Sequence, residues 1–319
     1  METVDCNLCG SAKLKFVYSM PDRHFFPNER FNVVECKGCG LGFVNPRPSF
    51  EEINRYYPAE FYEYFTTDLA FHKKRYQEES KYLLDVKKGK DRPRLLDIGC
   101  ANGDFARYMA TQGWEVEGVE ISANSQPIHD FPVYRIPFDQ LEGKCARYDA
   151  VTAWAVLEHV HNPMAYFRKA SEVLKSDGIF VFLVTNFKSL SSRRLFGEDV
   201  PRHLYFFTRD TIQRYMEIVG MELIAEDYRN NIYGMAPRGW LYYLITRLVK
   251  RRDFTWEDMP PSFSQYLNRN KLEKNIFSIF RYALTHPIDI LDRALVPLLE
   301  CYQIWTKTYG IVTYTARKK

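Results

Sequence analysis

The chain has 319 residues, of which 46% are hydrophobic and 26% charged, the balance of an ordinary soluble globular protein. Its formal net charge is only +4, which argues against a nucleic-acid partner for the whole chain, but residues 232–319 carry 14 Lys and Arg against 7 Asp and Glu and favour an anionic partner there. Because the start lacks the pattern of a signal peptide and no run of about 18 uncharged apolar residues occurs, we expect a cytoplasmic protein.

The N-terminal region contains two C-x-x-C pairs, each followed by a glycine, Gly10 or Gly40. The four cysteines are Cys6, Cys9, Cys36 and Cys39. Two such pairs present four thiolates to one ion and complete the tetrahedral coordination of a structural zinc ion. We predict that residues 1–46 form a zinc ribbon that holds Zn²⁺; two disulfides or four unrelated thiols are the alternatives.

Residues 47–92 are expected to form a helical linker. Ser49 and Glu52 form an S-x-x-E capping box, which marks the start of a helix. The stretch 71–89 then places four side chains near one helix face: Tyr76, Tyr82, Leu83 and Val86.

Residues 93–231 alternate apolar strands with helices. Strands are expected at 94–99, 114–120, 132–136, 148–157, 178–186 and 221–229, and helices at 103–113, 162–174 and 208–220. Asn162 and Thr208 are expected to cap the second and third helices. Repeated βα units with continuous apolar strands predict an α/β fold with a doubly wound, Rossmann-like parallel sheet.

The pattern changes over residues 232–308, which we predict to be a helical insertion before the last strand of the sheet. That strand, 309–319, alternates like an edge strand. Residues 238–252 combine Trp and Tyr with a basic cluster, and residues 286–305 form an apolar helical stretch interrupted by Pro297. We expect the insertion to cover an acceptor site; a dimer surface, or a peripheral contact of residues 238–252 with the inner membrane, are the alternatives.

The sequence LLDIGCANGDF, residues 95–105, raises the question of a ligand. It places Asp97 at the end of the first core strand, followed by Gly99 and Gly103. Ligands of doubly wound sheets bind beyond the carboxyl ends of the strands. The G-x-G-x-x-G pattern is absent, and the Asp97 carboxylate would repel a pyrophosphate but attract a sulfonium and an amine. Glu120, at the end of the second strand, can accept both hydrogen bonds of a ribose diol.

These residues resemble class I S-adenosylmethionine-dependent methyltransferases. The resemblance rests on LLDIGCANGDF, on the following VEGVEIS, and on the segment from 148 to 186 with its V-L-E-H-x-x-x-P signature, and it spans about residues 93–228. The segments CNLCG, CKGCGLGFVNPRP and DVPRHLYFFT look like a bacterial branch with a zinc ribbon, which includes sugar methyltransferases and proteins of polysaccharide gene clusters.

The resemblance implies a site for S-adenosylmethionine. Its methionine part would be wrapped by Asp97, Gly99, Cys100, Ala101 and Gly103. Glu120 would hold the ribose, Ile121 would pack against adenine, and Phe138 or its neighbour Pro137 would frame that base. Trp154 would lie near the methionine moiety, with plain core packing as the alternative.

This sequence departs from one related pattern that binds a metal ion. Ubiquinone-pathway O-methyltransferases have a similar E-x-x-E-H sequence that binds a divalent metal ion, but here the first position is Ala155, which leaves only Glu158 and His159. We therefore expect no catalytic metal ion.

Methyl transfer needs alignment of the acceptor and removal of its proton. His203, in the loop after the fifth strand, is our first candidate for the general base, and His159 is the second. The alternative for His203 is a loop histidine that hydrogen-bonds locally, and the alternative for His159 is a residue that organises the turn after the fourth strand. Arg202 is expected to bind an anionic acceptor, and Tyr57 to lie on the substrate side or to pack between the linker and the core.

The sequence therefore predicts an S-adenosylmethionine-dependent methyltransferase. Its acceptor would be small, a sugar, a nucleotide sugar or a glycan, methylated on oxygen or carbon with help from a histidine base. The alternatives are an RNA methyltransferase and a non-catalytic scaffold at a membrane surface that retains the cofactor fold. Nucleic acid is not the expected partner, because the ribbon is not basic and no aromatic stacking platform is evident.

Overall fold

A computed structural model describes residues 1–58, 60, 69–122, 130–229, 232–261, 263, 266–267 and 270–319. Its central sheet is built from β4 (Arg94–Ile98), β5 (Glu115–Val119), β6 (Val133–Tyr134), β7 (Tyr148–Trp154), β8 (Leu174–Thr185), β10 (Met221–Asp227) and β11 (Ile311–Lys318). The strands lie in the order β10-β11-β8-β7-β4-β5-β6. The five from β6 to β8 are parallel, and β11 is antiparallel to both of its neighbours. The α/β fold with a mainly parallel central sheet is confirmed.

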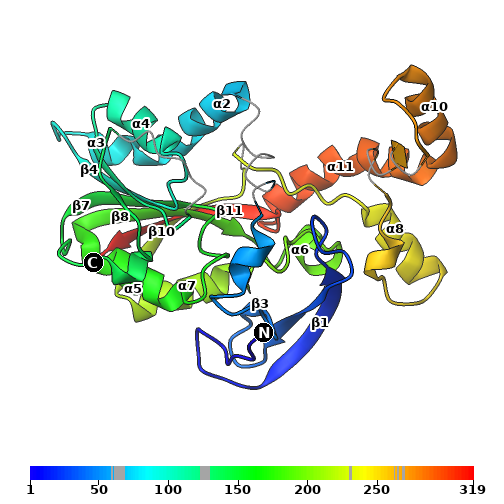
Figure 1. The fold of residues 1–319 in the computed structure, drawn as a ribbon, viewed down its shortest axis with the longest axis horizontal. Helices are drawn as coiled ribbons and strands as arrows, with labels where there is room; N and C mark the ends of the chain where they lie inside the picture. Colours follow the sequence, from blue (N-terminus) through cyan, green and yellow to red (C-terminus); the bar gives the residue numbers. More distant parts are fainter. Residues whose placement is uncertain are drawn as a thin grey trace.

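Helices cover both faces of this sheet (Figure 1). One face carries α2 (Leu69–Ser80), α3 (Leu84–Lys87) and α4 (Asp104–Thr111), and the other carries α5 (Pro163–Val173) and α7 (Arg209–Ile218). The short helix η2 (Lys81–Leu83) joins α2 to α3. As predicted, the side chains of Tyr76, Tyr82, Leu83 and Val86 pack together against the core beneath the first face.

The predicted helix caps are confirmed. Asn162 accepts a hydrogen bond from the N–H of Ala165 at the start of α5, and Thr208 accepts one from Thr211 at the start of α7. Ser49 and Glu52 form their capping box, although the helix that follows is only the short η1 (Ile53–Tyr56). The predicted helical linker also includes residues that lie outside the described ones.

The last strand differs from the prediction. Strand β11 lies inside the sheet, between β8 and β10, and is therefore not an edge strand. Its alternation does not separate core from solvent, because Tyr314 faces one side and Thr313 and Thr315 face the other, and all three are buried. The edge position belongs to β10.

The N-terminal region forms a second, antiparallel sheet. It contains β1 (Leu14–Pro21), β2 (Arg30–Cys36) and β3 (Gly42–Val44), joined by β9 (Tyr205–Phe206) from the loop between β8 and α7. The hydroxyl of Tyr18 also donates to the carbonyl of Ser192 at 2.9 Å. The N-terminal sheet is thus attached to the loop that carries His203.

The insertion forms an arm that projects from the core (Figure 1). We call "the arm" the elements α8 (Trp240–Leu244), the π-helical turn η4 (Ile245–Val249), η5 (Trp256–Asp258), α10 (Ile276–Thr285) and α11 (Pro287–Trp305). Pro297 does not interrupt α11 as predicted; the helix continues through it and loses only the hydrogen bond that a proline N–H cannot donate. Helix α10 lies within the predicted helical insertion, where the sequence pattern had not marked it as a separate element.

None of the helices in the described parts of the chain combines the length and the apolar character needed to cross a membrane.

Candidate active site

The turn after β4 is shaped by two glycines. Gly99 has φ +68°, and a Cβ there would lie 2.6 Å from the side chain of Val156. Gly103 has φ +79° and precedes α4 directly. Glycine at position 99 is therefore required by backbone conformation and by contact with the loop after β7, in addition to any approach of a ligand.

Asp97 lies at the carboxyl end of β4 and is buried. Its Oδ1 accepts a hydrogen bond of 2.7 Å from the hydroxyl of Thr152 on the neighbouring strand β7. Burial raises the pKa of Asp97 to about 7, although this hydrogen bond and the charge of Arg75 lower it. A buried carboxylate of this kind favours a cationic ligand, because a cation would stabilise its charged form.

Glu120 follows β5 and faces the same turn. Its carboxylate accepts hydrogen bonds from the N–H groups of Ala101 at 2.9 Å and Ser122 at 2.7 Å. A carboxylate has about four acceptor sites, so both oxygens keep capacity for the hydroxyls of a ribose. Glu120 is buried and does not face solvent. Ile121 is 54% exposed and offers an apolar surface beside it.

Two other predicted cofactor residues are buried in the core. The thiol of Cys100 lies against β5, where a Cβ at Gly118 would come within 2.6 Å of its sulfur. Phe138, in η3 (Phe138–Gln140), is fully buried and packs edge-on against Tyr166. Only their backbone can face a ligand without rearrangement.

Trp154 packs edge-on against Phe105, in accord with the core-packing alternative. Its indole Nε1 is nevertheless buried without a hydrogen-bond partner among the described residues. Buried indole N–H groups normally find an acceptor. The orphaned donor is therefore an observation that a bound ligand would explain.

Helix α2 adds two charged residues that the sequence analysis missed. Arg75 donates from Nε to Glu79 at 2.6 Å, and its guanidinium lies 4.6 Å from the ring centre of Tyr233. Burial raises the pKa of Glu79 to about 7, and the charge of Arg75 acts on Asp97. The sequence signal was the spacing of Arg75 and Glu79, four residues apart on one helix.

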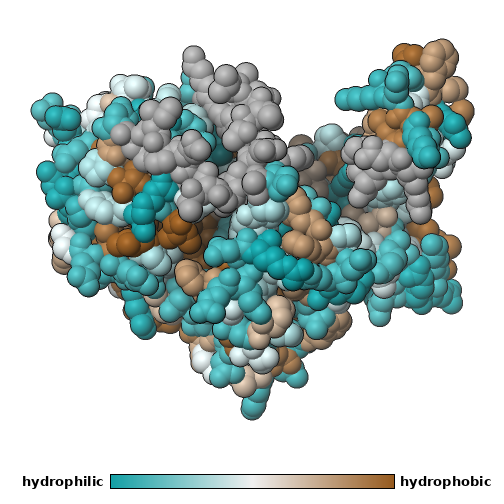
Figure 2. Space-filling model, in the orientation of Figure 1, coloured by the Kyte–Doolittle hydropathy of each residue, from teal (hydrophilic) through white to brown (hydrophobic). Residues whose placement is uncertain are grey.

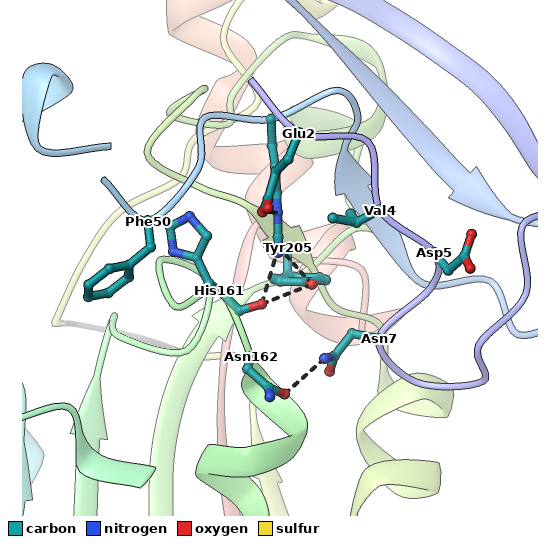
Figure 3. Close-up of a pocket in the computed structure, with 9 residues that line it drawn as sticks. Glu2, Val4, Asp5, Asn7, Phe50, His161, Asn162 and Tyr205 are labelled. Atoms are coloured by element: carbon teal, nitrogen blue, oxygen red, sulfur yellow. Dashed lines mark hydrogen bonds and ion pairs between the residues drawn. The ribbon is translucent and has the colours of Figure 1, made fainter. Parts of the chain in front are cut away.

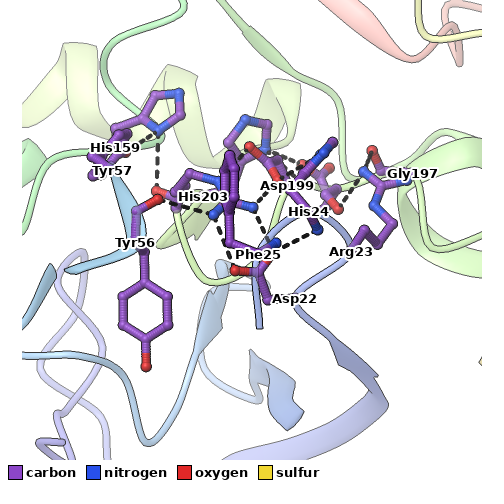
Figure 4. A network of polar contacts seen from close by, with 12 residues as sticks. Asp22, Arg23, His24, Phe25, Tyr56, Tyr57, His159, Gly197, Asp199 and His203 are labelled. Atoms are coloured by element: carbon purple, nitrogen blue, oxygen red, sulfur yellow. Dashed lines mark hydrogen bonds and ion pairs between the residues drawn. The ribbon is translucent and has the colours of Figure 1, made fainter. Parts of the chain in front are cut away.

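The two candidate bases lie together. The rings of His159 and His203 are 4.7 Å apart between centres. Together with Glu158, these two histidines place three atoms that could bind a metal ion within 4.8 Å of one another. His203 Nδ1 is 2.7 Å from Oε2 of Glu198, a fully buried carboxylate that sequence reasoning missed (Figure 4). The available signal was an acid five residues before His203 in the same loop.

The two histidines differ in their electrostatics. Burial alone would lower the pKa of His203, but the hydrogen bond and charge of Glu198 raise it above the ordinary 6.5. Burial lowers the pKa of His159 to about 3, and the charge of His203 acts in the same direction. Burial raises the pKa of Glu158 to about 7. His203 is thus the histidine equipped to take up a proton near neutral pH.

His159 is held by its surroundings. Its Nδ1 lies 2.9 Å from the hydroxyl of Tyr57 and 3.1 Å from the carbonyl oxygen of Arg202. Figure 4 shows Tyr57 and His159 side by side. Tyr57 therefore reaches the candidate site and does more than pack between linker and core.

The prediction for Arg202 is wrong. Its side chain is 0% exposed, and its guanidinium binds Asp22, Asp199 and the carbonyl oxygen of Tyr56 through all of its nitrogens (Figure 4). Its donors are engaged by two carboxylates of this chain, so it cannot bind an anionic acceptor. It joins the N-terminal sheet to the His203 loop instead.

The four N-terminal cysteines converge. Their sulfur atoms lie within 4.8 Å of one another, with Cys6 and Cys39 3.4 Å apart and Cys9 and Cys36 3.5 Å apart. A tetrahedral site with Zn–S bonds of about 2.3 Å has sulfurs about 3.8 Å apart, so the donor set fits a zinc ion. Gly10 and Gly40 have φ of +68° and +80°, as the predicted knuckle turns need.

A surface hollow of about 380 Å³ lies between the N-terminal segment and the core (Figure 3). Its polar groups already bind one another: Arg47 contacts Glu2 at 2.7 Å and the hydroxyl of Tyr205 at 2.8 Å, and Asn7 contacts Asn162 at 3.0 Å. We interpret this hollow as a seam between the two sheets and not as the active site.

Asp97 lies near the carboxyl end of β4, and Glu120, His159 and His203 follow β5, β7 and β8. All four belong to the carboxyl edge of the parallel part of the sheet, where ligands of such sheets bind. A family model described as a methyltransferase domain matches residues 69–226.

Curated relatives include the ubiquinone biosynthesis O-methyltransferase of Acinetobacter baumannii (strain AYE), 30% identical over 164 residues, which cover 47% of this chain and 67% of the relative. The enzyme of the same name from Cereibacter sphaeroides (strain ATCC 17029 / ATH 2.4.9) is 29% identical over 173 residues, covering 48% and 68%. A solved structure of an S-adenosylmethionine dependent methyltransferase from Mesorhizobium loti aligns with a TM-score of 0.43 and 15% identity, covering 75% of this chain and 97% of that one.

The chain belongs to the class I S-adenosylmethionine-dependent methyltransferases. The ribbon-bearing sugar branch, the roles of the individual site residues and the absence of a catalytic metal ion stay predictions.

Proposed function

We propose that this enzyme methylates a hydroxyl or a carbon of a small sugar, nucleotide sugar or glycan, with His203 as the general base and Glu198 as the residue that positions it. The contact of 2.7 Å between His203 Nδ1 and the buried carboxylate of Glu198 carries the proposal. A carboxylate–imidazole pair orients the ring, leaves Nε2 for the proton of the acceptor, and stabilises the imidazolium that forms.

S-adenosylmethionine, when bound, supplies a methyl group on a sulfonium sulfur, which leaves as a neutral thioether. Asp97 would hold the ammonium group of its methionine part, and Glu120 the ribose hydroxyls. In O-methylation His203 would accept the hydroxyl proton at Nε2 as the acceptor oxygen takes the methyl group from sulfur. The charge lost from sulfur thus reappears as a proton on the imidazole, next to Glu198.

The acidity of the acceptor favours a sugar over a phenol. A phenol ionises near pH 10, as tyrosine does, whereas a sugar hydroxyl is less acidic and depends more on a base. A histidine whose pKa is raised by a buried carboxylate suits the less acidic group. A phenolic acceptor is the second candidate, because the curated relatives are named as ubiquinone biosynthesis O-methyltransferases.

The test is methyl transfer to a panel of free sugars, nucleotide sugars and catechols. We expect turnover with a sugar and a fall of roughly 100-fold or more in kcat for His203→Asn, with unchanged affinity for S-adenosylmethionine by calorimetry. His161→Asn is the matched control, because His161 lies in the same region but contacts the carbonyl of Pro48 at 3.1 Å. Turnover of catechols alone, or an active His203→Asn variant, would reject the proposal.

The Glu198→Gln variant tests whether Glu198 positions His203 for proton transfer or only supports the fold. Because Glu198 raises the pKa of His203, its loss should move the acidic limb of the kcat/KM profile to lower pH as well as reduce the rate. A lower rate with an unmoved limb would show that Glu198 supports the fold only.

We also propose that the four cysteines hold one structural zinc ion, since all four ligands come from the protein and no coordination position stays open. Metal analysis of reduced, chelator-free protein should find about one zinc per chain, and Cys36→Ser should lose it. A metal-free protein of unchanged stability would contradict this assignment.

A further inference from the structure

The arm buries two acidic side chains of α11 and exposes many of its apolar ones. In α11, Asp289 and Asp292 are both 0% exposed, while Trp305 of the same helix is 81% exposed. In α10, Ser278 and Tyr282 face inward and Phe277 is 80% exposed. Helices on the surface of a soluble protein normally show the opposite pattern.

The buried polar groups have partners, so the inverted pattern is a stable arrangement. Asp292 accepts hydrogen bonds from the N–H groups of Gly239 and Leu241, each at 2.8 Å, at the start of α8. Asp289 accepts from the hydroxyl of Tyr282 at 2.8 Å and from Arg293 at 2.6 Å. Because polar contacts hold the helices together, their apolar faces are left outward.

The exposed apolar side chains form one-sided stripes. Phe277, Phe280 and Leu284 follow each other at helical spacing along α10, and each is at least 65% exposed. Leu248 and Val249 at the end of η4 are exposed to 71% and 74%. In Figure 2, brown apolar residues interspersed with teal polar ones lie at the outer end of the arm, over α10. An apolar surface of this kind marks an interaction site.

Cations accompany the apolar surface. Lys250 and Arg251 follow Val249 directly, Lys274 precedes α10, and Arg281 lies within it; all four are exposed and form no ion pair with the described residues. The sequence from 276 to 288 contains no acid. The carboxylates near Lys250 and Arg251 are already engaged, Asp253 by Arg247 and Asp258 by Arg252, and Glu273 is the exposed acid beside Lys274.

We infer that the apolar face of the arm docks on an anionic lipid surface. Exposed Phe and Leu side chains on elements that also carry uncompensated cations fit the acyl and headgroup layers of such a bilayer. A second copy of the chain fits less well, because a two-fold interface places the same patch on both sides and would bring these cations together. The inference is independent of the acceptor, so it can fail while the proposed function stands.

The test is sedimentation of the full chain with vesicles of phosphatidylcholine mixed with phosphatidylglycerol, and with vesicles of phosphatidylcholine alone. We expect binding to the anionic vesicles only, weakened by added salt. The double variants Phe277→Ser/Phe280→Ser and Lys250→Glu/Arg251→Glu should each reduce the vesicle affinity at least about tenfold. Phe16→Ser, which changes a phenylalanine 60% exposed on β1, is the matched control and should bind normally.

The arm variants should bind S-adenosylmethionine as the wild type does, which shows that they fold. The inference would be overturned if the wild type bound both vesicle types equally or bound neither. It would also be overturned if the Phe277→Ser/Phe280→Ser variant bound as tightly as the wild type. Sedimentation velocity without lipid tests the other occupant. If the wild type is a dimer, if the Phe277→Ser/Phe280→Ser variant is a monomer, and if neither binds vesicles, the face belongs to an interface with a second copy of the chain.

Discussion

Replacing Asp97 by asparagine should stabilise the ligand-free protein while destroying its cofactor site. Asparagine keeps the shape of the side chain and an oxygen that accepts from Thr152 Oγ1, now 2.7 Å from Asp97 Oδ1. It removes a carboxylate that burial makes costly, since the pKa of Asp97 rises from 3.8 to about 7. Such a gain at a binding site is the usual trade between stability and function.

The magnitude follows from the pKa values. The folded state binds the Asp97 proton more tightly than the unfolded state, so stability is lost as pH rises from about 4 to about 7. At pH 8 the carboxylate is charged in both states, and a pKa difference of about 3 corresponds to about 4 kcal/mol. Asp97→Asn should therefore raise the free energy of unfolding by up to about 4 kcal/mol at pH 8, and by little near pH 3.

Urea denaturation of the ligand-free protein at several pH values measures this effect. Asp149→Asn is the control, for which we expect the free energy of unfolding to change in the opposite direction. Asp149 lies near the amino end of β7, at the edge of the sheet opposite Asp97. Burial alone would raise the pKa of Asp149, but hydrogen bonds from the N–H of Arg94 and from Lys175 and Lys90 lower it to about 2. That variant should lose about 2 kcal/mol at pH 8. An Asp97→Asn protein no more stable than wild type at pH 8 would refute the reasoning.

Three further predictions concern the same region. Affinity for S-adenosylmethionine, measured by calorimetry, should fall up to about tenfold per pH unit below pH 7, because the ligand must displace the proton of Asp97; a flat profile from pH 8 to 6 would argue against it. Arg202→Met should lower the free energy of unfolding by roughly 3–5 kcal/mol because it leaves Asp22 buried without its cation; a stable variant with a raised KM for the acceptor would restore the sequence-based role. Gly99→Ala should cost about 1–3 kcal/mol in urea denaturation, and Val156→Ala should recover part of that loss by relieving the contact; no recovery would leave backbone strain as the whole cause.

The sequence was most informative where local pattern decides position. Asp97 and Glu120 follow apolar strands, and parallel strands present their carboxyl ends at one edge, so the amino-acid pattern alone predicts that these two carboxylates lie close together. The four cysteines were predictable for the same kind of reason, because two knuckles with glycines at positive φ converge whatever lies between them.

Contacts between distant parts of the chain could not be predicted in this way. Arg202 looked available for an acceptor because its partner Asp22 lies 180 residues away in the N-terminal hairpin. The N-terminal sheet takes β9 from the loop after β8, and the two-residue length of that strand gives no periodic signal.

The arrangement of the arm could not be predicted for a different physical reason. Helix α10 combines outward apolar residues with inward Ser278 and Tyr282, so the usual link between hydrophobicity and burial is reversed. Strand β11 misled in a milder way, because Thr313 and Thr315 are polar yet buried inside the sheet.

The central claim is that S-adenosylmethionine binds at the carboxyl ends of β4 and β5. Calorimetric titration of the purified full chain tests it most directly. We predict one cofactor bound per chain, with binding abolished in the Asp97→Ala/Glu120→Ala protein. Undiminished binding by the double variant, or no binding by the wild type, would contradict the account.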